Sequence, residues 1–99
     1  MSNTHGRAKR IPLTLDVAYR FVGETEWSRG RMLNVSESGV LFGPTRLMAG
    51  LAIEVIFTTP VLIGSIPPGR VICAAHVVRS TAAGGAAARF DEWRFLLDG

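Results

Sequence analysis

Two short segments carry the side chains best suited to binding an anionic ligand. Three of the four residues from Arg7 to Arg10 are cations, directly before an apolar run that begins at Ile11. Arginine presents a planar fork of donors that matches phosphate oxygens and the edge of guanine. The second segment runs from Asn34 to Gly39, where Asn and Ser side chains can bond nearby amides and the glycine permits a positive φ. A solvated basic tail and a well-formed turn are the alternative explanations.

Residues that could act as nucleophile, base or metal ligand are scattered along the chain. His5 lies near the N-terminus, His76 falls in the middle of a predicted strand, and Cys73 lies on an apolar strand face as a small hydrophobe. Asp91 and Glu92 are adjacent, so on a strand they point to opposite faces. A nucleophile needs a base and an orienting group, and a metal needs clustered ligands. The sequence therefore predicts a protein without catalysis, metal or cofactor.

Composition restricts the class of protein. A chain of 99 residues corresponds to one domain, and 47% hydrophobic residues exclude disorder throughout. No apolar run approaches the roughly 18 residues of a membrane helix. The polar N-terminus does not resemble a secretory signal, so we expect a cytoplasmic protein. The net charge is +3, and of the 11 cations all but Lys9 are arginine, which makes an anionic partner plausible, although GC-rich codon usage also explains it.

Alternation of apolar and polar residues with period two predicts an all-β protein. The expected strands cover residues 13–21, 27–35, 39–42, 51–57, 70–79 and 90–97, with a further short strand allowed at 61–63. Residues 44–50 offer a single candidate helical turn, and residues 82–88 are expected to form an Ala/Gly loop. Six antiparallel strands at short spacing predict a small barrel or sandwich, and closure of a barrel removes exposed edges.

The aromatic residues bear on another possible class of function, that of the small barrels that bind RNA or DNA. Such proteins stack bases on exposed aromatic side chains beside cations. Here the alternation predicts that most strand aromatics face the core, namely Tyr19, Phe21, Phe57 and Phe95, and leaves Trp27 and Trp93 ambiguous. Binding to a nucleic-acid polymer is therefore not expected.

The order and spacing of the two polar segments resemble the PilZ domain family. That family carries Arg-x-x-x-Arg just before the first strand and Asp/Asn-x-Ser-x-x-Gly leaving the second. This chain has Arg-Ala-Lys-Arg at residues 7–10 and Asn-Val-Ser-Glu-Ser-Gly at residues 34–39. Arg-Ile-Pro-Leu at residues 10–13 and the apolar run after Gly39 also fit, and the match extends from about residue 7 to residue 97.

The resemblance implies a six-stranded, split, Greek-key-like β-barrel that binds the bacterial second messenger cyclic di-GMP. It implies a flexible basic segment at residues 1–10 that folds over the ligand, and one barrel domain at residues 11–99. Ligand binding would change the surface shown to a downstream protein partner, without membrane insertion. The implied ligand-binding residues are Arg7, Arg10, Asn34, Ser36, Ser38 and Gly39.

One spacing departs from the family pattern. Four residues before Arg10 stands Gly6, and the nearest cation is Arg7, so the motif is Arg-x-x-Arg. One residue corresponds to about 3.3 Å of extended chain, which a long arginine side chain can span. PilZ proteins with degenerate arginine motifs act as protein-interaction modules without nucleotide. An adaptor that does not bind nucleotide is therefore the alternative function.

Overall fold

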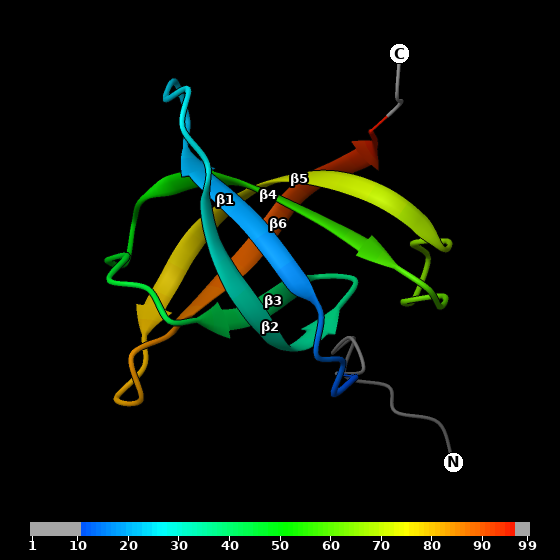
Figure 1. Cartoon of the computed structure of the whole chain (residues 1–99), viewed down its shortest axis with the longest axis horizontal. Helices are drawn as coiled ribbons and strands as arrows, with labels where there is room; N and C mark the ends of the chain where they lie inside the picture. Colours follow the sequence, from blue (N-terminus) through cyan, green and yellow to red (C-terminus); the bar gives the residue numbers. More distant parts are fainter. Residues whose placement is uncertain (1–10, 97–99) are drawn as a thin grey trace.

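The computed structural model describes residues 11–96, and within them the protein is all-β, with no helix. Its strands form a closed antiparallel barrel in the order β1-β2-β3-β6-β5-β4 (Figure 1). The strands are β1 (Asp16–Phe21), β2 (Ser28–Ser36), β3 (Gly39–Gly43), β4 (Ala52–Thr59), β5 (Gly69–Ser80) and β6 (Ala86–Phe95). The predicted small six-stranded antiparallel barrel is confirmed.

The barrel consists of two three-stranded meanders. Strands β1, β2 and β3 follow one another, as do β4, β5 and β6, and residues 44–51 connect the two groups. The barrel closes where β3 pairs with β6 and where β4 pairs with β1. The spatial order β3-β6-β5-β4 is that of a Greek key, in which three sequential strands are flanked by one that arrives through a longer connection.

The core is formed by the inward-facing residues of the alternating strands. In β4, Ile53, Val55 and Phe57 are buried, and in β5 Val71, Cys73, Ala75 and Val77 are buried, as the alternation predicts. The ring of Tyr19 packs against that of Phe42 with 5.0 Å between centroids. Burial of side chains of this size is the main favourable contribution to folding, about 1.5–3 kcal/mol each.

Four local predictions differ from the structure. Residues 82–88 do not form one loop, because Ala86, Ala87 and Ala88 are buried at the start of β6, where they pair with β3. Alanine has low strand propensity, so only the tertiary pairing places it in the sheet. Residues 44–50 contain no helical turn, and residues 61–63 contribute only the isolated bridge from Ile63 to Ile66. The strand expected from residue 13 begins at Asp16.

β-Bulges change which residues face the core. The pairing of β5 with β6 skips one residue between Phe90 and Glu92, so Phe90 and Trp93 both pack against the core. Phe95 is 40% exposed and Phe21, the last residue of β1, is 43% exposed, so the prediction that both are core residues was wrong. The bulge accounts for Phe90 and Trp93 sharing a face, whereas Phe21 and Phe95 are exposed because each is the last residue of its strand.

Candidate ligand-binding site

The described chain begins directly beside the polar segment of β2. The amide of Ile11 donates to the carbonyl of Val35 at 2.7 Å, and the amide of Val35 donates to the carbonyl of Ile11 at 3.0 Å. Val35 lies between Asn34 and Ser36, so the entering chain is fixed next to both of them (Figure 1). Arg7, Arg10 and the predicted flexible segment of residues 1–10 lie outside the described residues.

The turn from β2 to β3 is held by a buried hydroxyl. Ser36 is 1% exposed, and its Oγ accepts a hydrogen bond from the amide of Ser38 at 3.2 Å and lies 3.1 Å from the Ser38 Oγ. Ser38 itself is exposed, and Asn34 is partly exposed. Of the predicted site residues in this segment, Asn34 and Ser38 can therefore reach a ligand, whereas Ser36 shapes the turn.

Gly39 has a steric role in place of the expected positive φ. Its backbone does not adopt a positive φ. Instead, a Cβ at this position would lie 2.4 Å from the carbonyl oxygen of Ala88. Glycine is therefore required because β3 and β6 approach each other closely here, and no side chain fits between them.

The carboxylate in the middle of the turn is engaged by a neighbouring loop. Glu37 accepts hydrogen bonds from the amide of Ser65 at 3.0 Å and from its hydroxyl at 2.8 Å. These two bonds, the hydroxyl one first, hold the pKa of Glu37 below its usual value. The contact ties the β2–β3 turn to the connection between β4 and β5, so the turn has a defined position before any ligand binds.

The structure adds one cation that the sequence did not reveal. Arg89 on β6 pairs with Gly39 on β3 and is exposed, and the neighbouring amide of Phe90 donates to the carbonyl of Ser38 at 2.8 Å. Arg89 therefore lies alongside the turn, on the side of β3 away from β2. No sequence signal pointed to Arg89, because the strand that carries it was expected to start after it.

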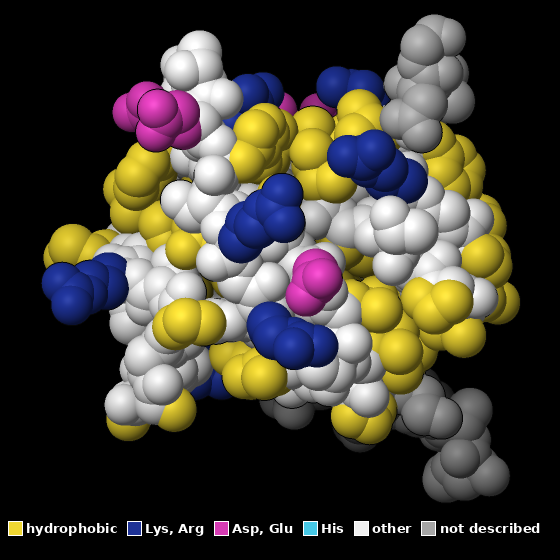
Figure 2. Space-filling model, viewed as in Figure 1, with side chains coloured by type: hydrophobic (Ala, Val, Ile, Leu, Met, Phe, Trp, Pro, Cys, Tyr) yellow, Lys and Arg dark blue, Asp and Glu magenta, His cyan; other side chains and the backbone are white. Residues whose placement is uncertain are grey.

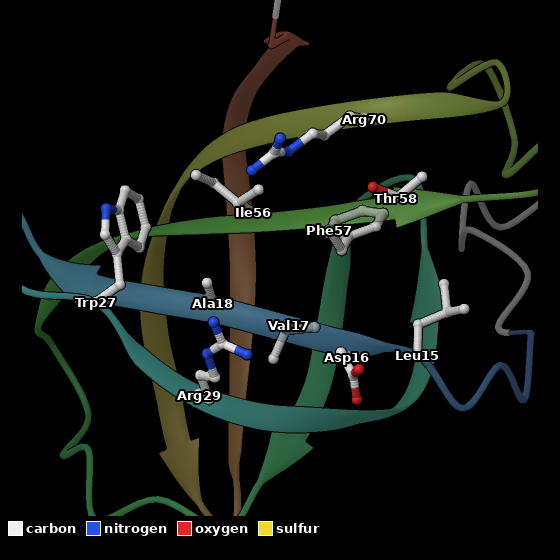
Figure 3. A pocket seen from close by; sticks show the side chains of 10 residues that line it. All are labelled: Leu15, Asp16, Val17, Ala18, Trp27, Arg29, Ile56, Phe57, Thr58 and Arg70. Carbon is white, nitrogen blue, oxygen red and sulfur yellow. The ribbon is translucent and has the colours of Figure 1, made fainter. Parts of the chain in front are cut away.

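A separate groove opens on the outer surface between β1 and β4 (Figure 3). Its volume is about 590 Å³, within the range of ligand sites in proteins. Its lining comprises Leu15, Asp16, Val17, Ala18, Trp27, Arg29, Ile56, Phe57, Thr58 and Arg70. Of the predicted site residues, those that the structure describes, Asn34, Ser36, Ser38 and Gly39, do not line this groove, and nothing in the sequence analysis pointed to it.

His76 and Cys73, two of the titratable groups considered above, lie in different environments. His76 Nδ1 lies 2.9 Å from Asp91 Oδ1 on the barrel surface, and Cys73 is fully buried in the core. Within residues 11–96, no group of three or more His, Cys, Asp or Glu residues is placed to hold a metal ion. The same part of the chain contains no helix capable of spanning a membrane.

Burial raises the pKa of the Cys73 thiol from 9.0 to about 12, which predicts a loss of stability in alkali. Below about pH 9 the thiol is protonated in both the folded and the unfolded chain. Above it only the unfolded chain ionises, so the free energy of unfolding falls by up to about 1.4 kcal/mol per pH unit until the folded thiol also ionises. Urea denaturation at about pH 8 and about pH 10 measures this loss, and the free energy of unfolding should fall less between the two pH values for Cys73→Ala than for the unaltered protein. Equal declines for the two proteins would contradict this prediction.

Comparison of the chain with protein-family models, with curated proteins and with solved structures finds no match.

Proposed function

We propose that this protein is a non-enzymatic receptor for cyclic di-GMP that changes its surface for a protein partner when the ligand binds. The observation that supports the proposal most is the double hydrogen bond between Ile11 and Val35. It brings the chain that follows the basic residues alongside the segment from Asn34 to Gly39, as the resemblance to PilZ domains requires. Arg10 immediately precedes Ile11 in the sequence, so its side chain starts one residue from this contact.

The available groups match the chemistry of the ligand. Cyclic di-GMP presents two phosphates and two guanines, and the proposed site offers a guanidinium from Arg10 and one from Arg89. An arginine can donate two parallel hydrogen bonds to O6 and N7 of guanine, which discriminates against other bases by about 1–3 kcal/mol. The amide of Asn34 and the hydroxyl of Ser38 can each donate to and accept from a base edge. Arg7, the nearest cation to the missing first arginine, would pair with phosphate.

In this proposal the basic segment before Ile11 becomes ordered over the ligand, and this ordering is the output signal. Ordering a segment on binding reduces affinity but couples the ligand to the surface that a partner contacts. The rigid part of the site is prepared in advance by the bond between Ser36 and Ser38 and by the contact between Glu37 and Ser65.

A nucleotide-independent adaptor is the second candidate, and two observations favour it. The Ser36 hydroxyl is buried and used within the turn, and the basic motif has one residue fewer than the family pattern. In this candidate, Ser36 and Gly39 stabilise the fold and do not contact a ligand. The protein would then present the same surface to its partner at all times.

Isothermal titration with cyclic di-GMP separates the two candidates. We expect saturable heat with a dissociation constant in the micromolar range, and at least about a tenfold loss of affinity for Arg10→Ala and for Asn34→Ala, since each removes a direct contact. Arg46→Ala is the matched control, because Arg46 is an exposed cation on the connection between β3 and β4. No heat from the unaltered protein up to about 1 mM ligand would favour the adaptor.

A further inference from the structure

The groove between β1 and β4 exists because these strands separate before they end. Their pairing covers Phe21 to Ala18 on β1 and stops at the pair of Ala18 with Ile56. Beyond that pair, Asp16 and Val17 continue to pair with β2, while Phe57 and Thr58 continue to pair with β5. The barrel wall is therefore open over this length, and two strand edges face each other across the groove (Figure 3).

The edges of the groove carry backbone groups directed into it. The amide of Val22 donates to Ala52 on β4, and the carbonyl of Leu15 accepts from Met32 on β2. Because successive residues of a strand point their backbone groups to opposite sides, the even-numbered residues of β1 direct theirs toward β4. Asp16 has no partner on β4 in the pairing of the described residues. The same alternation on β4 leaves Thr58 directed toward β1 without a partner there.

The inner and outer sides of the groove differ in chemistry. Toward the barrel interior lie Val17 and Phe57, which are 3% and 2% exposed, and toward solvent lie two arginines. Figure 3 shows the guanidinium groups reaching over the groove from its two walls, that of Arg29 beside Ala18 and that of Arg70 beside Ile56. Several arginine side chains lie on this face in Figure 2, with hydrophobic side chains between them. The acidic side chain at the groove, Asp16, lies 3.7 Å from Arg31.

We propose that this groove binds an extended segment of a partner protein in which acidic and apolar residues alternate, by addition of a β-strand to the open edges of β1 and β4. Main-chain hydrogen bonds to Asp16 and Thr58 would supply affinity, as in other cases of strand addition. Alternate side chains of an added strand point to opposite faces, so the apolar ones turn toward the partly buried Leu15 on the inner side of the groove, while the acidic ones turn toward the exposed Arg29. The inference is independent of nucleotide binding and concerns a contact separate from the surface that the proposed ligand would change.

The test measures fluorescence polarisation of a labelled, end-capped heptapeptide, Val-Glu-Val-Glu-Val-Glu-Val, with the protein and no nucleotide. We expect saturable binding that weakens at least about tenfold when lysine replaces glutamate in the peptide and when Arg29→Glu reverses the charge of the protein. A peptide with proline at its third position should also bind about tenfold more weakly, because proline cannot donate to a strand ladder. Arg46→Glu, with the same charge change outside the groove, should leave the affinity unchanged.

Amide exchange measured by nuclear magnetic resonance gives a second readout that does not depend on a variant. The amides of Asp16 and Thr58 should exchange rapidly in the free protein and become protected when the acidic peptide is bound. Absence of binding up to about 1 mM peptide overturns the proposal, as does equal binding of the lysine peptide. So does displacement of the acidic peptide by an octathymidylate, which would indicate a nucleic-acid groove. Protection of the two amides that depends on protein concentration alone would indicate pairing between copies of the chain and would also overturn it.

Discussion

Replacing Gly39 with alanine should lower the free energy of unfolding by about 3 kcal/mol, a large part of the stability of a small domain. The added Cβ would meet the backbone carbonyl of Ala88 at 2.4 Å, and neither strand can move without breaking the pairing of β3 with β6. Urea denaturation followed by far-ultraviolet circular dichroism measures the loss. The pairing of β3 with β6 positions both the β2–β3 turn and Arg89, so the variant should also bind cyclic di-GMP more weakly.

Gly50→Ala is the matched control for Gly39→Ala. Gly50 has a φ of +93°, and a Cβ there would have no heavy atom within 4 Å. Only backbone strain should act, and it costs about 1 kcal/mol. If Gly39→Ala is no more destabilising than Gly50→Ala, the close approach of β3 and β6 is not what requires glycine at position 39.

Phe42→Ala should be the most destabilising of the single substitutions considered, with a loss of about 4 kcal/mol in the free energy of unfolding. The Phe42 side chain is fully buried in the middle of the barrel, and its ring packs against Tyr19 with centroids 5.0 Å apart. Truncation removes the buried ring and leaves a cavity that the closed sheet cannot collapse to fill. The loss is measured by chemical denaturation.

Phe21→Ala is the corresponding change at an exposed aromatic residue. Phe21 is 43% exposed at the end of β1, so its truncation should cost less than about 1 kcal/mol. Similar losses for Phe42→Ala and Phe21→Ala would mean that the two rings are equally buried in solution, contrary to the structure.

The strands were predictable where alternation is uninterrupted and fully apolar on one face. Residues 51–57 and 70–79 meet that condition, and both are strands with the expected buried face. The pattern failed where a bulge changes the phase, as it does between Phe90 and Trp93, because an unpaired residue is defined by the partner strand and not by local sequence. It also failed at Ala86, whose burial depends on how closely β3 lies.

The candidate site was only partly visible in the sequence. The segment from Asn34 to Gly39 was identifiable because its residue types and spacing are local. Arg89 was not, because the pairing of Gly39 with Arg89 joins positions 50 residues apart. The groove between β1 and β4 was equally hidden, since it arises where two strands stop pairing, and no residue type marks that point.

A titration of isotope-labelled protein with cyclic di-GMP, followed by amide chemical shifts, tests the central claim most directly. The account predicts saturable shifts concentrated at Asn34, Ser38, Gly39 and Arg89, with the amides of Asp16 and Thr58 in the groove unaffected. Shifts confined to the groove, or no shifts at saturating ligand, would contradict the proposal that the messenger binds where the entering chain meets the β2–β3 turn.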